Sequence, residues 1–485
     1  TGDRPIAILN EEEADNYGIH PGDRVSLIWS KNRKITVAVD VSNKQVKPGQ
    51  IGLFKDLWHK KEVEDGDIVE AVLESRPLSI ETIKKKMLGR PASYDEIYAI
   101  IDDIVNGKLG EVEITYFVST SFVKSYSDEE IYYLSKAMAE TGDQFDLKMK
   151  SADKHSVGGL PGNRTTPIIV PIIASLDICI PNTSSRAITS PAGTADVMEV
   201  LCPVSFSLEE IKKIVRKTNG CLVWGGGLHL APADDKIIKI NRPLGLEPYD
   251  KMVVSIMAKK VATGVDSLVI DIPVGENCKV PKMKYSRQIE KKFEFLAKKF
   301  KMKIKVLPNS AKEPVGQGIG PALEARDCLR VLQQYKYRPM DLENKSVKQA
   351  GILLELHGHC KPGQGREIAQ KQLKTGKAWK KMNEIIVAQG GKNDINSEEV
   401  MQEIRRYEIH AHKNGKITFV NNRAVTEICQ NLGAPLDKFA GIHLHVSLGQ
   451  KVKKGEKLFT MYASSEERLK LGLLASKSNL IHVIK

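Results

Sequence analysis

Two stretches of sequence decide what fold and chemistry we expect: Lys154-His155-Ser156-Val157-Gly158-Gly159 and Ser184-Ser185-Arg186-Ala187-Ile188-Thr189-Ser190-Pro191-Ala192-Gly193-Thr194-Ala195-Asp196. Each combines small residues, which let a backbone approach a ligand closely, with hydroxyl groups and one or two cations. Proteins hold phosphate in this way, by N–H and O–H donors around a positive charge. We call residues 150–166 the first loop and residues 184–196 the second loop, and we expect both to bind phosphate.

Length and composition indicate a multidomain soluble protein. A chain of 485 residues is too long for one core and suggests three or four domains. A net charge of +13 is typical of nucleic-acid-binding proteins. However, 73 basic and 60 acidic residues are interleaved, and aromatic residues make up only 6% of the chain. A solvated surface and a small anionic substrate are therefore favoured, and a nucleic-acid-binding or scaffold protein is kept as the alternative of another class.

The cysteines and the apolar segments predict a cytoplasmic protein. Seven cysteines lie singly, with no Cys-x-x-Cys pair, which argues against a disulfide framework; they are Cys179, Cys202, Cys221, Cys278, Cys328, Cys360 and Cys429. The longest apolar run, Ile168 to Ile180, is interrupted by Pro171 and Asp177 and is too short to cross a bilayer. No signal-peptide pattern opens the chain.

The order of strand and helix patterns predicts an α/β multidomain fold with four parts. They are a β-rich assembly domain at 1–78, a helical domain at 79–149 plus about 233–264, a mixed α/β phosphate-binding domain at 150–232 plus 265–400, and an α+β hammerhead-like domain at 401–485. Helices are expected at Tyr94–Asn106, after Ser127, at Ser207–Thr218 and at Tyr249–Ala262, and a buried strand at Leu268–Ile272. The apolar run from Ile168 fits either a helix or a strand.

Several side chains beside the two loops are candidates for binding a ligand. In the second loop, Arg186 offers a planar fork for an anionic oxygen, although an ion pair with Asp196 or Glu199 is the alternative. Ser255 and Lys259 lie four residues apart on one helix and so face the same side. Lys260 is expected on a solvated face.

The two loops resemble the signatures of a known enzyme family. The pattern Ser-Ser-Arg-Ala-x-x-x-x-x-Gly-Thr-x-Asp-x-x-Glu, from Ser184 to Glu199, is similar to the signature of the thymidine and pyrimidine-nucleoside phosphorylases. Lys-His-Ser-x-Gly-Gly at 154–159 resembles that family's phosphate loop. The archaeal-type AMP phosphorylases, a branch with an added N-terminal domain, resemble essentially the whole chain. Further matches lie at 255–260 and 316–327.

This resemblance implies roles for individual residues. Phosphate would be held by Lys154, Ser156, the amide of Gly159, Ser184 and Thr194, with Thr165 or Thr166 adding a hydroxyl. The nucleotide would be held by the run Ser185, Arg186, Ala187, Ile188, Thr189 and Ser190, together with Ser255, Lys259 and Lys279. The resemblance also implies a homodimer or higher homo-oligomer, a cleft that closes on substrate, and no cofactor, with inorganic phosphate as co-substrate.

The chain departs from the family where the base is bound. Pyrimidine phosphorylases carry an Arg about fifteen residues before the helix Ser, where this chain has Ile240 or Asn241, with Arg242 shifted. AMP phosphorylases have an Asp at the position of Glu247, which would protonate the leaving base if burial raised its pKa. Asp250 and His155 are the alternatives for proton transfer.

The expected reaction is phosphorolysis of AMP, and of CMP or UMP as further substrates, to the free base and α-D-ribose 1,5-bisphosphate. A pyrimidine-nucleoside phosphorylase is the runner-up, and a magnesium-dependent phosphoribosyltransferase is a further rival. Three His-x-His pairs, starting at His357, His410 and His443, suit zinc in principle, but they lie away from both loops. No metal site is therefore expected.

Overall fold

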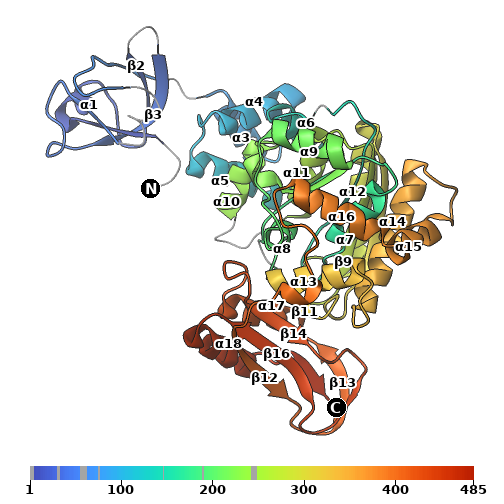
Figure 1. The fold of residues 1–485 in the computed structure, drawn as a ribbon. Coiled ribbons are helices and arrows are strands. Elements are labelled where there is room, and N and C mark those ends of the chain that lie inside the picture. Colours follow the sequence, from blue (N-terminus) through green and yellow to red (C-terminus); the bar gives the residue numbers. More distant parts are fainter. Residues whose placement is uncertain are drawn as a thin grey trace. The chain divides into compact units, whose positions relative to one another are not determined.

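The computed structural model describes residues 5–29, 33–54, 63–74, 77–145, 147–187, 190–241 and 248–485. The chain divides into two compact units (Figure 1). The first unit contains Thr1–Ala137 and Ala233–Leu246, and the second contains Met138–Pro232 and Glu247–Lys485. The first and second loops both belong to the second unit.

The first unit begins with a five-stranded sheet in the order β4-β1-β3-β2-β5. Its strands are β1 (Ile6–Leu9), β2 (Arg24–Trp29), β3 (Arg33–Val41), β4 (Ile51–Leu53) and β5 (Glu70–Leu73), with helix α1 (Glu11–Asn16) after β1. Strands β1 and β3 are parallel, and the other pairs are antiparallel. Alternate residues such as Val25, Leu27, Val37 and Val39 form its core, as the β-rich pattern predicted.

A group of helices follows the sheet. They are α3 (Ser79–Met87), α4 (Tyr94–Val105), α5 (Glu111–Val123), α6 (Asp128–Glu140) and, later in the chain, α10 (Pro232–Asn241). Helix α4 begins at a capping box, in which Ser93 and Glu96 each bond the other's backbone N–H. Its apolar residues, spaced by three and four positions, are buried, so the predicted helix at 94–106 is confirmed.

The second unit is built on parallel strands. A three-stranded sheet has the order β10-β9-β6, and β7 pairs with β8. The strands are β6 (Ala152–Ser156), β7 (Ile180–Ser184), β8 (Gly220–Trp224), β9 (Ser267–Val274) and β10 (Lys303–Ser310). An isolated parallel bridge between Ser151 and Cys179 joins the starts of β6 and β7. The first loop therefore includes β6 and continues beyond its carboxyl end at Ser156, and the second loop begins at Ser184, the last residue of β7. Ligands bind at these carboxyl ends in open α/β sheets.

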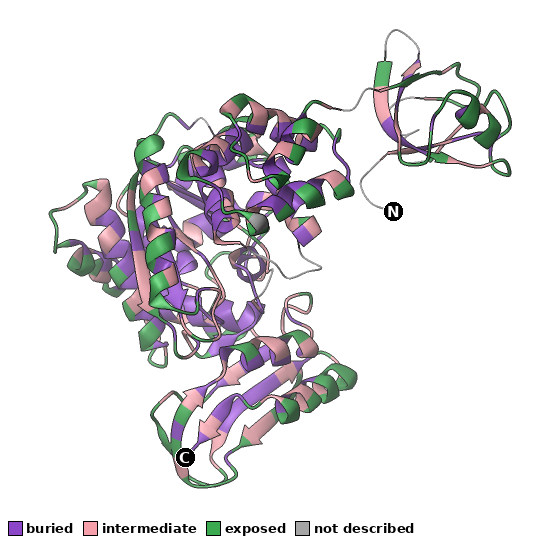
Figure 2. Cartoon of the chain, turned by 180° about the vertical axis from the view of Figure 1, so that it is seen from behind, coloured by how far each residue is buried: buried purple, intermediate pink, exposed green. Residues whose placement is uncertain are grey.

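Helix α7 (Thr166–Ala174) resolves the ambiguity of the apolar run. All nine of its residues are buried, which explains why the sequence shows no amphipathic period there. It packs against α14 (Met340–His357) and α16 (Lys377–Ala388) in the main hydrophobic core. In Figure 2 buried residues fill the interior of this part of the chain. The first loop thus ends on a fixed helix.

The remaining helices surround the parallel strands. They are α8 (Thr194–Met198), α9 (Leu208–Thr218), the 3-10 turn η1 (Gly225–Gly227), α11 (Tyr249–Ala262), α12 (Met283–Lys299), α13 (Pro321–Leu332), α15 (Gly365–Lys374) and the 3-10 turn η3 (Ser397–Glu399). Helix α9 confirms the helix predicted at Ser207–Thr218; Ser207 is its N-cap and forms a capping box with Glu210. Helix α11 has the predicted bounds.

The C-terminal part is α+β. A four-stranded antiparallel sheet has the order β11-β14-β16-β12, and a three-stranded one the order β15-β13-β17. The strands are β11 (Gly318–Ile319), β12 (Arg405–His410), β13 (Gly415–Val420), β14 (Gly441–Leu444), β15 (Lys451–Val452), β16 (Lys457–Ala463) and β17 (His482–Ile484). Helices α17 (Asn422–Leu432) and α18 (Glu466–Ser478) pack together beside them. The predicted α/β multidomain class is confirmed.

Candidate active site

Lys154 is the buried cation of the first loop. It lies on β6 with 1% of its surface exposed, and its Nζ donates to the hydroxyl of Thr165 at 2.6 Å and lies 3.4 Å from that of Thr166. Burial, with the charges of Lys345 and Arg164, lowers the pKa of the Lys154 ammonium to about 7, although Asp271 acts in the opposite direction. The sequence left Thr165 and Thr166 open, and the structure brings both to Lys154.

Ser156 is held by a carboxylate that the sequence analysis did not select. Asp271, on β9, is fully buried, and its Oδ2 lies 3.3 Å from Ser156 Oγ, 2.8 Å from Asn163 Nδ2 and 3.1 Å from Lys345 Nζ. Its Oδ1 accepts from Asn309 Nδ2 at 2.8 Å. Burial alone would raise the pKa of Asp271, but the charges of Lys345 and Lys154 hold it below its usual range. Ser156 therefore donates to an ionised carboxylate.

The second loop is folded around Asp196. One oxygen of that carboxylate accepts from the backbone N–H groups of Ala187 (2.7 Å) and Gly193 (2.8 Å). Gly193 is required here because a Cβ at that position would lie 2.4 Å from the carbonyl oxygen of Ser185. The loop also bonds internally and to β8: Ser190 Oγ donates to the Ala192 carbonyl at 2.9 Å and Ser184 Oγ to the Val223 carbonyl at 3.2 Å.

Arg164 joins the two loops. Its Nη1 donates to Thr194 Oγ1 at 2.9 Å and its Nη2 to the Ala192 carbonyl at 2.6 Å. Its Nε pairs with Glu324 of α13 at 2.7 Å. Thr194, predicted to bind phosphate, is thereby brought to the first loop.

Arg186 occupies the ion pair that the sequence left as an alternative. Two of its nitrogens donate to the two carboxylate oxygens of Glu199, both at 2.7 Å, and Nη1 also lies 3.3 Å from Asp196. These bonds, with Lys438, lower the pKa of Glu199 to about 2 against the effect of burial. The guanidinium also lies 5.0 Å from the ring centre of Trp224. A role for Arg186 in nucleotide binding stays a prediction.

The expectation for Lys260 is wrong. This side chain is 1% exposed, and its Nζ lies 2.6 Å from Asp153 Oδ2, at the start of the first loop. The other oxygen of Asp153 accepts from Asn182 Nδ2 of β7 at 2.7 Å. A helical period does not reveal which of two neighbouring lysines faces inward when α11 is buried on most of its surface.

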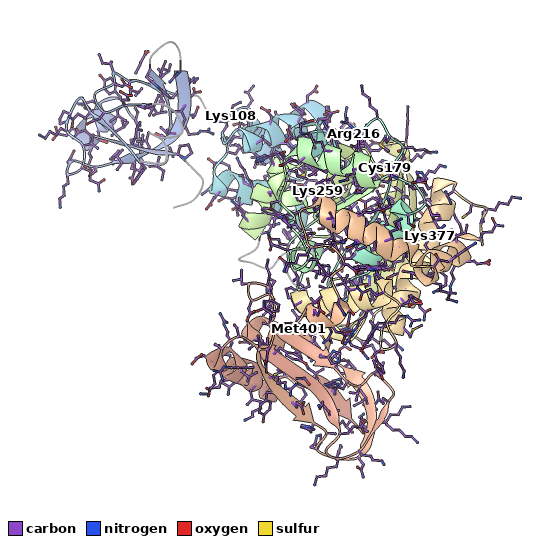
Figure 3. The ribbon with its side chains drawn as sticks, viewed as in Figure 1. Lys108, Cys179, Arg216, Lys259, Lys377 and Met401 are labelled. Carbon is purple, nitrogen blue, oxygen red and sulfur yellow. The ribbon has the colours of Figure 1, made fainter. Side chains whose placement is uncertain are left out.

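The predicted nucleotide-binding lysines lie near the first loop. The backbone of Lys279 packs so closely on Gly159 that a Cβ there would lie 2.8 Å from the Lys279 nitrogen, and Gly159 has φ +83°. Ser255 and Lys259 lie four positions apart on α11, where Figure 3 labels Lys259. Burial, followed by the charges of Lys260, Lys154, Lys259 and Lys279, lowers the pKa of His155 well below its ordinary value. His155 is therefore a neutral imidazole near pH 7.

Some predicted residues lie outside the described ranges. Glu247, Ile188 and Thr189 belong to this group, as does Arg242. The alternative acid, Asp250, has its carboxylate 3.0 Å from Lys292 of α12. Ser185 is exposed.

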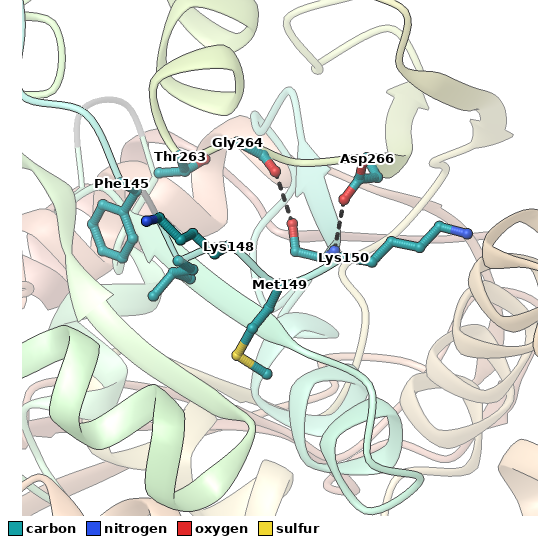
Figure 4. A pocket seen from close by; sticks show the side chains of 9 residues that line it. Phe145, Lys148, Met149, Lys150, Thr263, Gly264 and Asp266 are labelled. Carbon is teal, nitrogen blue, oxygen red and sulfur yellow. Dashed lines mark hydrogen bonds between the residues drawn. The ribbon is translucent and has the colours of Figure 1, made fainter.

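One cavity lies away from the predicted site residues. It has a volume of about 370 Å³ and lies at the amino-terminal ends of β6 and β9 (Figure 4). Ser151 forms part of its wall. The backbone N–H of Ser151 donates to the Asp266 carboxylate, and its hydroxyl donates to the Gly264 carbonyl. The part of the first loop that follows Ser156 lies at the opposite end of β6.

The histidine pairs make other contacts. His443 bonds Arg326 at 2.9 Å, and His445 bonds Thr460 at 2.8 Å. Within the described ranges no group of three or more His, Cys, Asp or Glu side chains is placed to hold a metal ion. No described helix is long and apolar enough to cross a membrane.

Comparisons with known proteins show the family of this chain. Three family models match: the glycosyl transferase family helical bundle domain at residues 80–142, its a/b domain at 148–379, and the pyrimidine nucleoside phosphorylase C-terminal domain at 416–479. The AMP phosphorylase of Pyrococcus furiosus is 45% identical over 98% of this chain and 94% of its own. That of Methanocaldococcus jannaschii is 43% identical over 96% and 92%. The chain belongs to the AMP phosphorylase family.

A solved structure supports the fold of part of the chain. Anthranilate phosphoribosyltransferase from Thermus thermophilus matches with a TM-score of 0.53 and 16% identity, covering 64% of this chain and 99% of its own. This likeness concerns the fold alone. The sequence resemblance of the AMP phosphorylase family extends over nearly the whole chain, including the first unit.

Proposed function

We propose that this protein splits AMP with inorganic phosphate to adenine and α-D-ribose 1,5-bisphosphate, with CMP and UMP as further substrates. The observation that carries the proposal is the junction of two hydroxyl-rich loops at Arg164 and Thr194, beside the buried Lys154. Relatives that carry the name AMP phosphorylase, similar over 95% or more of the chain, support this substrate.

In the proposed reaction, a phosphate oxygen forms a bond to C1′ of the ribose as the bond from C1′ to the base nitrogen breaks. The electron pair of that bond leaves with the base, and a positive charge develops on the sugar. Bound phosphate stabilises this charge, so the protein chiefly positions the two substrates. Lys154, the Thr165–Thr166 hydroxyls, Ser184 and Thr194 hold the phosphate, with Ser156 and the amide of Gly159 completing its site.

The nucleotide is held by Lys279 and by Ser255 and Lys259 on one face of α11. Glu247 protonates the departing purine, for which general acid catalysis contributes about 10²–10⁴ in rate. His155 is neutral, because burial and the surrounding lysines lower its pKa. It therefore acts as a hydrogen-bonding group near the sugar rather than as a cation.

The setting of the enzyme is also part of the proposal. All seven cysteines are free, which supports a reducing, cytoplasmic location. We propose a homodimer or higher homo-oligomer that uses inorganic phosphate as co-substrate and no metal or organic cofactor.

The test is phosphate-dependent release of base in EDTA, comparing AMP with adenosine and uridine. Adenine from AMP but not from adenosine, with a sugar bisphosphate seen by phosphorus NMR, is the expected result. Turnover of uridine in place of AMP would move the chain to the pyrimidine-nucleoside phosphorylases. Activity that EDTA abolishes would favour a phosphoribosyltransferase, and no turnover of any substrate would overturn phosphorolysis.

A further inference from the structure

Arg164 is a nearly buried cation whose contacts bridge the two phosphate loops. Its side chain is 11% exposed, and its partner Glu324 is 1% exposed. Glu324 also accepts from the backbone N–H of Gly320 at 3.1 Å, which fixes the carboxylate from a second side. The guanidinium is thus held from behind by α13, while its other two nitrogens face the second loop at Ala192 and Thr194.

The chemistry of this contact fixes the direction of one hydrogen bond. A guanidinium only donates, so Thr194 Oγ1 must accept from Arg164. The hydroxyl proton of Thr194 is then available to another acceptor. Thr194 is the first residue of α8.

Ser156 shows the opposite arrangement in the first loop. Its hydroxyl lies against Asp271, an ionised carboxylate that only accepts, so its proton is already used. The oxygen of Ser156 in turn lies 3.3 Å from the Gly158 N–H and 3.3 Å from Asn163 Nδ2. Of these two predicted phosphate-binding hydroxyls, that of Thr194 is the one oriented to donate.

We propose that Arg164 is a positioning residue for phosphate: it turns the Thr194 hydroxyl into a donor and locks the second loop against the first. The proposal rests on the function proposed above. Arg164 acts through Thr194 and the Ala192 carbonyl, since its nitrogens are engaged by these groups and Glu324. It therefore differs from Lys154, whose ammonium is expected to contact phosphate directly.

The positive charge of Arg164 also acts on the Lys154 ammonium. Burial is the main cause that lowers the pKa of Lys154, and the charges of Lys345 and Arg164 follow. Arg164 directly precedes Thr165, whose hydroxyl accepts from Lys154 Nζ at 2.6 Å. Phosphate bound there would be attracted by both cations.

The experiment is phosphate titration calorimetry on the full chain, with steady-state kinetics on the same samples. The variants are Arg164→Met, Arg164→Lys, Thr194→Val and the double variant Arg164→Met/Thr194→Val. Arg330→Met and Arg330→Lys are matched controls, because Arg330 is also 11% exposed and pairs through two nitrogens with Glu398. The described hydrogen bonds of Arg330 do not reach either loop.

Arg164→Met should weaken phosphate binding about tenfold and raise the KM for phosphate by the same factor, with the KM for AMP changed less than about threefold. Thr194→Val should have a similar effect. If Arg164 acts through Thr194, the double variant loses about 10- to 20-fold rather than the roughly 100-fold expected of independent sites. Arg330→Met should lower the unfolding midpoint without altering phosphate binding.

A purely structural role would overturn the proposal: Arg164→Met would then lower the unfolding midpoint while phosphate bound as in the wild type. An additive double variant would overturn the route through Thr194. If Arg164→Met does not fold, Arg164→Lys decides, because a lysine cannot reproduce the three-way contact and should still lose phosphate affinity. If the wild type binds phosphate but releases no base from AMP, the proposed function fails while calorimetry still tests Arg164.

Discussion

The first and second loops use their polar groups in different ways. In the first loop, the hydroxyls of Ser156 and Thr165 and the amide of Asn163 are bonded to buried groups behind them, namely Asp271 and Gln349. In the second loop, the carboxylate of Asp196 shapes the backbone and Arg164 orients Thr194 from the side. The first loop therefore supplies a buried charge on a fixed frame, and the second supplies an oriented donor. One buried ion pair, Lys260–Asp153, connects the two strands that lead to the loops, because Asp153 of β6 also bonds Asn182 of β7.

That ion pair gives the largest expected effect. Lys260→Met leaves the carboxylate of Asp153 buried without its cation, which typically costs about 3–5 kcal/mol. Because Asp153 also bonds Asn182 of β7, both loops should lose their alignment, so phosphate and AMP affinities should fall together. Chemical denaturation measures the change in unfolding free energy.

The control for this change is Lys470→Met, which removes the cation of an exposed pair with Glu466 and should leave the unfolding free energy almost unchanged. An equally small loss in Lys260→Met would mean that the pair does not organise the two loops.

Lys154→Met should show what the first loop contributes apart from the second. It removes the only cation of the predicted phosphate set, so we expect phosphate affinity to fall about 100-fold, as for lost charge-assisted hydrogen bonds. AMP affinity should change much less. Equal losses for both substrates would mean that Lys154 supports the whole site rather than phosphate alone.

The sequence predicted the hydrogen-bond donors of the two loops better than the buried side chains that hold those donors in place. Lys154, Ser156 and Thr194 stand in compact patterns with glycine and can be read from the chain. Asp271, Lys345 and Arg164 come from β9, α14 and the approach to α7, and only the fold brings them together. One signal was available: Asp271 is a charged residue inside a strand predicted to be buried, and such a residue needs partners. For Lys260, by contrast, neither spacing nor residue type indicated the buried side of α11.

The pH dependence of anion binding should follow the protonation of the Lys154 side chain. Its ordinary pKa of 10.5 is lowered to about 7 by burial. The cation is present below pH 7 and is lost as the pH rises through that value. Sulfate, a dianion throughout this range, should therefore bind about tenfold more weakly per pH unit above 7. Competitive inhibition by sulfate against phosphate measures this from pH 6 to 9.

The control is Lys154→Arg, since arginine stays protonated and should remove the slope. A slope that persists in this variant would assign the titration to another group.

Removing the Thr194 and Ser156 hydroxyls one at a time compares the two loops directly. Thr194→Val should raise the KM for phosphate about tenfold, because an oriented donor is lost. Ser156→Ala should raise it less than about threefold, because that hydroxyl donates to Asp271. Initial rates at varied phosphate and saturating AMP measure both. The reverse order would mean that Ser156 turns from Asp271 to phosphate when the substrate binds.

Arg186 gives the smallest expected effect and tests whether the second loop binds nucleotide with this side chain. Glu199 accepts two hydrogen bonds from its guanidinium, and the Trp224 ring lies beside it, so the cation already has a carboxylate partner and an aromatic neighbour. Arg186→Lys keeps the charge but not the paired geometry, and we expect the KM for AMP and for phosphate to change less than about twofold. A rise of tenfold or more in the KM for AMP alone would show that substrate displaces Glu199 from the guanidinium. Arg186 would then belong to the nucleotide site, and the ion pair in the structure would be the resting partner that AMP replaces.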